Sequence, residues 1–316
     1  MTLAGAAVLG SAALLAAAIG VGGATGVGPT AAGAALTARL AAAIGGQEIR
    51  LAPGDYGKIR FPARSYTPAL RIDAREARFS GLVLKGVTGV SIVGGTVVGP
   101  GGRSYGVEVT DVRDLRIEGM TITGSHRGIV LGRSSEVALV GNTLTGLLSD
   151  GIDIAQARRI EVRGNRCSDF SPTPTTFDAQ GKRLKVGDHP DCIQSWSRPA
   201  SPPTADLVIE DNVREGRMQG IFMGNHVRNG VNDGGYDRII IRNNRVRVTH
   251  PNGIVIYDAR DSIVTGNTVS TYPGPVNPRS GRPNRSNIRV KDGVRTIVCG
   301  NRIADFPNTP STRRCR

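Results

Sequence analysis

The sequence is poor in aromatic residues, which make up 4% of its 316 residues, and Trp196 is its single tryptophan. We therefore expect a core of small and branched aliphatic side chains. Four cysteines in a chain of this length exclude a small disulfide-dense scaffold, and 43 glycines argue against a bundle of long helices. Because only one long apolar run exists, a multi-span membrane protein is excluded as well.

Charge is absent from the first 38 residues, since the first charged residue is Arg39. The run from Leu3 to Ile19 is typical of a secretory signal, and small residues at 22–24 suit a signal peptidase. The usual basic start of a signal is missing, so we interpret residues 1–25 as a signal peptide or an N-terminal anchor. We expect a secreted or periplasmic protein, and an even number of cysteines is compatible with that compartment.

Acidic residues are outnumbered, because 40 Lys and Arg against 26 Asp and Glu give a net charge of +14. An excess of this size favours an anionic partner, namely an acidic polysaccharide, nucleic acid or a membrane surface. The chain carries no basic patch interleaved with aromatics and no known nucleic-acid motif. We therefore expect an acidic polysaccharide as partner, no nucleic acid, and no membrane beyond the N-terminal anchor.

A short run of alternating aliphatic residues, often ending in Gly-Asn, recurs along the chain. Its copies end at positions 95, 120, 142, 165, 212, 244, 267 and 301. Most steps are 22 to 25 residues, and the longer ones hold two units or an insertion. A second alternating run precedes most copies and a third short one follows the Asn. Three short strands in each unit predict a parallel β-helix, whose coils stack about 4.8 Å apart to complete a shared core.

The repeat predicts an all-β solenoid, a single-stranded parallel β-helix of about 9–11 coils, over residues 36–306. Residues 36–46 are expected to form a short amphipathic helix that caps the first coil, and 307–316 a C-terminal tail. We expect the recurring Asn residues to adopt left-handed turn conformations and to hydrogen-bond along the helix axis; they are Asn142, Asn165, Asn212, Asn244, Asn267 and Asn301. Two inward columns are expected from the alternation: Val107, Ile129, Ile152, Ile193, Ile221, Ile254 and Ile288, then Val109, Leu131, Ile154, Ser195, Met223, Ile256 and Val290.

These repeats resemble the right-handed parallel β-helix family of pectate lyases, polygalacturonases and related polysaccharide-active proteins. The resemblance covers most of the chain and is specific for fold rather than for chemistry, since such helices also serve as adhesins and spikes. Sites on such a scaffold are usually built on loops. Insertions interrupt the repeat beside one strand column, at 166–190, 197–206, 224–236 and 268–286.

Three aspartates lie beside these insertions, Asp150 and Asp153 in one unit and Asp191 in the next. Alignment of the two strands pairs Asp150 with Asp191 and Asp153 with Gln194, each about 4.8 Å apart. Three carboxylates so close cannot all ionise without a cation or a raised pKa. The options are a Ca²⁺ site formed by the three aspartates, an acid/base pair, or turn capping. His189 is the candidate general base beside them.

Further polar and aromatic residues along the same face form the predicted substrate site. Trp196 would stack on a sugar ring or pack beneath its loop, and Arg289 with Lys291 would hold a uronate carboxylate. The predicted substrate-binding residues are Lys185, Gln194, Trp196, Gln219, Asn225, Tyr257, Arg289 and Lys291.

Four boxes on successive coils are similar in order to those of polygalacturonase-like hydrolases: Ser149-Asp150-Gly151, Pro190-Asp191-Cys192, Met218-Gln219-Gly220 and Arg289-Val290-Lys291. In that resemblance Asp150, Asp191, Arg289 and Lys291 match, whereas Pro190 and Gln219 stand in place of a carboxylate and a histidine. Ordinary hydrolysis would then need Asp188 or His189 as acid.

We therefore expect a polysaccharide lyase that cleaves a uronate-containing polymer by β-elimination. Ca²⁺ held by the three aspartates would neutralise the uronate carboxylate, with His189, Lys185 or an arginine as base. The alternatives are a hydrolase that uses Asp150 and Asp191, an epimerase, and a non-catalytic carbohydrate-binding or structural β-helix. No organic cofactor is expected, and the protein should act as a monomer.

The four cysteines have distinct expected roles. Cys299 lies within reach of Cys315, and a disulfide there would staple the C-terminal end of the solenoid. Cys167 is expected to be a thiol in the core, although a bond to Cys192 on the next coil is open to it.

Overall fold

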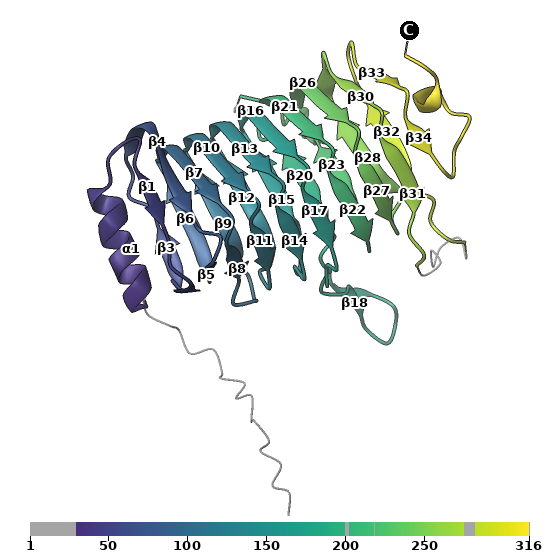
Figure 1. The fold of residues 1–316 in the computed structure, drawn as a ribbon. Helices are drawn as coiled ribbons and strands as arrows, with labels where there is room; N and C mark the ends of the chain where they lie inside the picture. Colours follow the sequence, from purple (N-terminus) through teal and green to yellow (C-terminus); the bar gives the residue numbers. More distant parts are fainter. Residues whose placement is uncertain (1–29, 200–201, 218, 275–281, 316) are drawn as a thin grey trace, which may run out of the picture.

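The computed structural model of the protein describes residues 30–199, 202–217, 219–274 and 282–315. They form one elongated stack of coils with a helix across one end and a 3₁₀ turn near the other (Figure 1). Parallel strands make up three long sheets, which we call sheets A, B and C, and each regular coil contributes one strand to each. The fold is a right-handed parallel β-helix of about ten coils, as the repeat predicted. The apolar segment 1–25 lies outside the described residues.

Sheet A holds the strands that end before the recurring Asn. They are β1 (Glu48–Arg50), β4 (Ser65–Asp73), β7 (Thr88–Val93), β10 (Arg113–Glu118), β13 (Ser135–Val140), β16 (Arg158–Arg163), β21 (Thr204–Glu210), β26 (Tyr236–Arg242), β30 (Ile263–Thr265) and β33 (Ile297–Cys299), with β29 (Ala259–Arg260) beside β26.

Sheet B holds the short strands that follow the Asn. They are β2 (Gly54–Asp55), β5 (Ala77–Phe79), β8 (Thr96–Val98), β11 (Thr121–Thr123), β14 (Thr143–Thr145), β17 (Arg166–Ser168), β22 (Val213–Gly216), β27 (Arg245–Val248), β31 (Thr268–Thr271) and β34 (Arg302–Ile303).

Sheet C holds the column beside which the insertions occur. Its strands are β3 (Lys58–Arg60), β6 (Gly81–Lys85), β9 (Tyr105–Thr110), β12 (Arg127–Gly132), β15 (Ile152–Ala155), β20 (Ile193–Trp196), β23 (Ile221–Gly224), β28 (Asn252–Tyr257) and β32 (Asn287–Lys291). Insertions 166–190 and 268–286 precede sheet C strands, and 197–206 and 224–236 follow them. They therefore flank sheet C on both sides. Two of them carry hairpins: β18 (Thr176–Phe177) with β19 (Arg183–Lys185), and β24 (Val227–Arg228) with β25 (Val231–Asn232).

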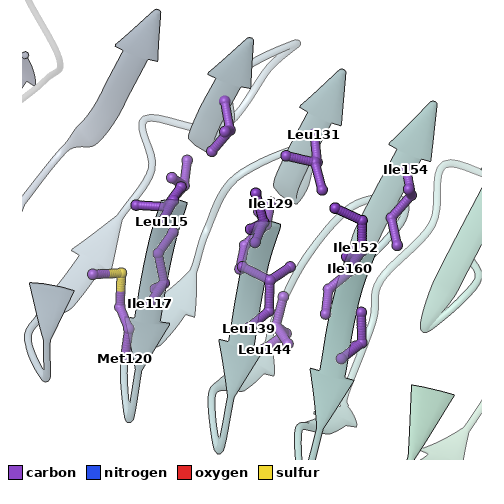
Figure 2. Close-up of a cluster of buried hydrophobic side chains, with 14 of the residues drawn as sticks. Leu115, Ile117, Met120, Ile129, Leu131, Leu139, Leu144, Ile152, Ile154 and Ile160 are labelled. Carbon is purple, nitrogen blue, oxygen red and sulfur yellow. The ribbon is translucent and has the colours of Figure 1, made fainter. Parts of the chain in front are cut away.

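The core runs along the axis of the stack and consists almost wholly of aliphatic side chains. Figure 2 shows a stretch of it, in which Ile117 stacks on Leu139 in sheet A and Ile129 stacks on Ile152 in sheet C. Both predicted inward columns are observed in register and buried, except that Val290, near the C-terminal end, is only half-buried.

The Asn ladder is confirmed as a chain of hydrogen bonds along the axis. The backbone N–H and side-chain amide of Asn165 both donate to Asn212 Oδ1, at 2.9 and 3.0 Å, and Asn212 donates likewise to Asn244. The expected left-handed conformation of these residues is wrong, because positive φ occurs at the preceding residue; those residues are Gly141, Gly164, Asp211, Asn243, Gly266 and Gly300. The preceding residue makes the turn and leaves the Asn side chain directed at its neighbours in the stack.

The capping helix α1 (Ala31–Ala42) begins five residues earlier than expected. The Thr30 hydroxyl accepts a hydrogen bond from Gly33 N at 3.0 Å and caps the first turn, so the alanine-rich segment before Leu36 is helical too. Leu36 and Leu40 are buried against the first coils. Among the described residues, no helix has the length and apolar character needed to cross a membrane.

Both cysteine pairs form disulfides. The expected bond between Cys299 and Cys315 is present, with Cα atoms 5.1 Å apart. The expectation of a free thiol at Cys167 is wrong, because Cys167 is bonded to Cys192 with Cα atoms 5.6 Å apart. The two residues stand at the two ends of insertion 166–190, and the bond closes its base.

Candidate functional site on the outer face of sheet C

Sheet C brings together the aspartates of two successive coils. Asp153 pairs with Gln194 in the parallel register of β15 and β20, as predicted. Two residues before each strand, the Asp191 N–H donates to Asp150 Oδ1 at 3.0 Å, which confirms the pairing of Asp150 with Asp191. The three carboxyl groups therefore form one cluster.

The cluster lies beneath the surface. Asp150 is 3% exposed, and Asp153 and Asp191 are fully buried. Gln194 Nε2 donates to Asp191 Oδ2 at 2.9 Å and covers it from the outer side. Because the three carboxyl groups are covered by neighbouring side chains, a ligand on the surface would not contact them directly. An acid/base role for the three aspartates stays a prediction.

Arg127 is the cation of this cluster. Its Nε lies 3.3 Å from Asp150 Oδ2 and its Nη1 lies 3.1 Å from Asp153 Oδ2. It begins strand β12, in the same column as Asp150, and its guanidinium lies 6.0 Å from the centre of the Trp196 ring. Arg127 thus places a positive charge beside Asp150 and Asp153.

A metal site is not evident around the aspartates. Within the described parts of the chain, no group of three or more His, Cys, Asp or Glu side chains is arranged to hold an ion. Arg127 contacts two of the three carboxyl groups that would serve as ligands. Calcium binding by Asp150, Asp153 and Asp191 stays a prediction.

All three carboxyl groups are harder to ionise than a free aspartate. Burial raises the pKa of Asp150, although the Asp191 amide and Arg127 oppose it. Burial, and then the charge of Asp150, raise the pKa of Asp153 well above its usual value. Burial and both neighbouring carboxyl groups do the same to the pKa of Asp191. The cluster therefore carries less negative charge than three free aspartates would at the same pH.

A second arginine lies on the inner side of the cluster. Arg214, on β22, is 1% exposed and occupies the inward column between Cys167 and Val246. Its guanidinium lies 4.4 Å from the centre of the Phe170 ring and its Nε donates to Gln219 O at 3.2 Å. Burial lowers the pKa of Arg214 to about 10, against the opposing effect of Asp191. The arginine remains charged at neutral pH and faces the buried Asp191 from within.

Three adjoining hollows follow the outer face of sheet C, and we call them together the groove. The middle one has a volume of about 300 Å³ and is lined by Arg127, Gln194, Trp196, Phe222 and His226, among others. One neighbour, of about 430 Å³, shares Arg127. The other, of about 510 Å³, shares Trp196 and His226. The inserted loops form the two banks of the groove.

The basic excess of the chain is evident in the groove. Lys185 lies on one bank, and Arg103 and Arg127 line the same hollow. Arg198 and Arg228 line the hollow on the other side of Trp196, opposite Asp233. A polyanion would meet positive groups along most of this path.

The structure places the predicted substrate-binding residues in two groups. Lys185, Gln194 and Trp196 line the groove. Tyr257, Arg289 and Lys291 instead line a separate hollow of about 500 Å³ near the C-terminal end. Its Lys291 ammonium lies 5.6 Å from the centre of the Tyr257 ring.

Gln219 and Asn225 are largely committed to contacts within the protein. Gln219 Oε1 accepts from the Asn252 amide, which is in turn bonded to Arg289. Asn225 donates to Asn232 at 2.9 Å and accepts from Gly235 N at 3.0 Å, so it ties down the loop after β23. Both are less than 9% exposed, and substrate contact by either stays a prediction.

His189 is exposed and lies near His250 rather than in the groove. Burial, with the charges of Arg289 and His189, lowers the pKa of His250 to about 4. That influence indicates that His189 faces the Arg289 side of the molecule. It does not line the hollow that Lys185 shares with Arg127.

Sequence reasoning missed a histidine that does line the groove. His126 precedes Arg127, and its Nε2 lies 3.2 Å from Asp188 Oδ1 on the opposite bank. The sequence does place Arg127, the next residue, in the same column as Asp150 and Asp191, which points to this turn. The contact of His126 with Asp188 could not be predicted, because it depends on the path of the inserted loop.

Comparisons with known proteins agree with this architecture. The family described as "Right handed beta helix region" matches residues 80–233. A tailspike protein of E. coli bacteriophage HK620, in complex with a pentasaccharide, superposes with a TM-score of 0.54 at 14% identity, over 84% of this chain and 57% of the other. An exopolygalacturonase of Thermotoga maritima superposes with a TM-score of 0.50 at 14% identity, over 85% of this chain and 74% of the other. No curated protein sequence matches the chain.

Identities of 14% show the fold alone, and the chain spans little more than half of the tailspike chain. The resemblance inferred from the repeats is confirmed at that level. The protein is a right-handed parallel β-helix with the architecture also found in a tailspike and an exopolygalacturonase.

Proposed function

We propose that the protein is a carbohydrate-active enzyme that binds a uronate-containing polysaccharide in the groove and cleaves it by β-elimination. The observation that carries the proposal is the groove itself, in which Arg127 and Trp196 stand together on the outer face of sheet C. Trp196 offers a flat apolar face to a sugar ring, and Arg127 offers a positive charge to a carboxylate.

Elimination suits the exposed groups better than hydrolysis does. A lyase must neutralise the uronate carboxylate so that the proton beside it becomes acidic, and a base must remove that proton. The electrons then form a C=C bond as the glycosidic C–O bond breaks, and the leaving oxygen takes a proton from water. Arg127 and Lys185 line one hollow of the groove together with Arg103, and these cations could meet the carboxylate.

Hydrolysis is the second candidate, because raised pKa values are typical of a general acid. Hydrolases of this kind place two carboxyl groups beside the glycosidic bond. Here Asp150 and Asp191 are 3% and 0% exposed, so hydrolysis would require the groove to open around them.

The two β-helix proteins that superpose on the chain support a carbohydrate ligand. The tailspike is in complex with a pentasaccharide, and the other is an exopolygalacturonase. Two disulfides suit an oxidising compartment, and we include secretion or export to the periplasm in the proposal. Detection of the processed protein outside the cytoplasm would test that part.

The test incubates the protein with a panel of polyuronates and neutral glucans, with and without Ca²⁺. We expect ultraviolet absorbance from an unsaturated uronate to grow on at least one polyuronate and on no neutral glucan. Arg127→Gln should abolish it, whereas Arg166→Gln, an equal loss of charge on the exposed side of sheet B, should not. New reducing ends without absorbance would establish the hydrolase, and retention of a polyuronate without cleavage would establish a binding protein.

A further inference from the structure

The hollow beside Arg127 contains a pair of side chains suited to proton transfer. It has a volume of about 430 Å³, and its lining includes Arg127, Lys185, His126 and Asp188. His126 lies in the turn just before β12, and Asp188 lies in insertion 166–190. The rigid coil and the inserted loop therefore each contribute one member of the pair.

Asp188 holds the imidazole in one orientation. Its Oδ1 lies 3.2 Å from His126 Nε2, and its Oδ2 accepts from Thr173 N at 3.3 Å. Burial alone would raise the pKa of Asp188, but the hydrogen bonds from Thr173 and His126 outweigh it and lower that pKa. An ionised carboxylate is only an acceptor, so His126 Nε2 carries the proton of this contact.

An imidazole that donates through Nε2 has its lone pair on Nδ1. The His126 and Asp188 side chains are 21% and 23% exposed, enough for a ligand in the hollow to reach the ring. Arg127, the next residue in the chain, is 28% exposed and faces the same hollow. A base and a carboxylate-binding cation thus stand side by side at one site.

We propose that His126 is the catalytic base of this protein and that Asp188 is its positioning residue, an assignment that rests on the elimination proposed above. The uronate carboxylate pairs with Arg127, and His126 Nδ1 takes the proton from the adjacent carbon. The electron pair forms the C=C bond and expels the glycosidic oxygen. Water protonates that oxygen, and the hydroxide produced takes the proton back from the imidazolium.

With His126 as base, the three buried aspartates need not contact the polymer for it to be cleaved at the surface. Asp150 and Asp153 contact Arg127 and fix its position, rather than contacting the sugar. The Cys167–Cys192 disulfide closes the base of the insertion that carries Asp188. Arg127 and His126, which would contact the substrate, are thus held in place by Asp150, Asp153 and Asp188, which would not.

The test measures unsaturated product and polymer retention in affinity gels for His126→Ala, His126→Gln and Asp188→Asn. We expect His126→Ala to lower kcat about 10²- to 10⁴-fold with retention of the polymer unchanged. Added imidazole should restore part of the rate, because it can occupy the space of the missing ring. His126→Gln, which can still donate to Asp188 but has no basic nitrogen, should be equally slow and folded by circular dichroism.

Asp188→Asn should lower kcat with little change in KM, and imidazole should not rescue it, because the His126 ring is still in place. Wild-type kcat in His126→Gln, or a loss confined to His189→Ala, would overturn the assignment while leaving elimination intact. No unsaturated product from the wild-type protein on any polyuronate would instead overturn the proposed function.

Discussion

Asp153 is the one of the three aspartates whose carboxyl group accepts no hydrogen bond. It is fully buried, and its partner is the Arg127 guanidinium at 3.1 Å. Burial and the Asp150 charge raise its pKa well above the usual value. The folded protein therefore keeps a proton that the unfolded chain releases at about pH 4. The contribution of Asp153 to stability therefore falls as the pH rises from that point toward the raised pKa.

We expect Asp153→Asn to remove this dependence, because an amide does not ionise. Relative to the wild type, the variant should gain stability as the pH rises from about 4 toward 8, measured as the midpoint of urea unfolding. Asp111→Asn is the matched control. Hydrogen bonds from Arg133 lower the pKa of Asp111, so that variant should lose stability relative to the wild type as the pH rises to about 4 and differ from it by a constant amount above that pH. A pH-independent difference between Asp153→Asn and the wild type would contradict the prediction.

Residue pairing within the site was predictable, whereas its counter-ion was not. Period-2 alternation and a constant unit fix the register, so the partners of Asp150 and Asp153 follow from the sequence. The contact of Arg127 with Asp150 and Asp153 was not predicted, because its side chain extends to the next coil. Alternation shows only whether a side chain points inward or outward. Cys167 was assigned as a thiol because nothing in a spacing of 25 residues shows that an inserted loop returns to its own base.

At the scale of elements, the Asn ladder joins sheets A and B in the coils from Asn142 to Asn301. Asn212 accepts from both nitrogens of Asn165 and donates to Val162 O at 2.8 Å, so its loss leaves several buried groups unpaired. We expect Asn212→Ala to lower the free energy of unfolding by on the order of 3 kcal/mol. Asn308→Ala, in an exposed part of the tail, should change it little. Equal midpoints for the two variants in urea would contradict a structural ladder.

The two disulfides should differ in function more than in stability. Each closes a loop of similar length, 25 and 16 residues, so the paired Ala variants should each lose about 3 kcal/mol by denaturant unfolding. Only the variant without Cys167 and Cys192 should also lose polyuronate cleavage at temperatures where it remains folded. That bond closes the insertion that carries Asp188, whereas the bond between Cys299 and Cys315 lies at the end of the stack. An equal loss of activity in both variants would count against this distinction.

The strands could be predicted from the repeat, because each unit contains three short alternating runs and the same three recur from unit to unit. Helix α1 was predicted with the wrong start because amphipathic spacing becomes visible only at Leu36, whereas Thr30 begins the helix by capping it. The turn residues were assigned one position late for a related reason. Asn tolerates a left-handed conformation, but here its side chain is needed in the ladder and the preceding residue turns instead.

At the scale of the whole molecule, basic side chains that contribute to the net positive charge line the groove. Net charge is +14, yet many arginines of sheet A are paired with acidic residues, as Arg163 and Arg242 are with Glu210. We expect polyuronate binding to weaken as salt rises, since screening at 0.1 M acts over about 10 Å. Lys185→Ala should make binding less sensitive to salt, and Arg166→Gln, an equal change in net charge, should not. Identical salt dependence in the two variants, measured by affinity electrophoresis, would mean that net charge alone attracts the polymer.

Stacked coils also restrict where any outward side chain of sheet C can stand along the axis. Asp153, Gln194, Phe222 and Val255 occupy successive rungs of one column, and an insertion lengthens a loop without changing the rung to which the chain returns. Neighbouring rungs lie about 4.8 Å apart, so positions in this column differ by whole multiples of that distance. The outward side chains of this column are therefore evenly spaced along the axis. A polymer whose own repeat matches a multiple of that spacing can present the same part of each sugar to successive positions, whereas the sugars of any other polymer shift steadily relative to them.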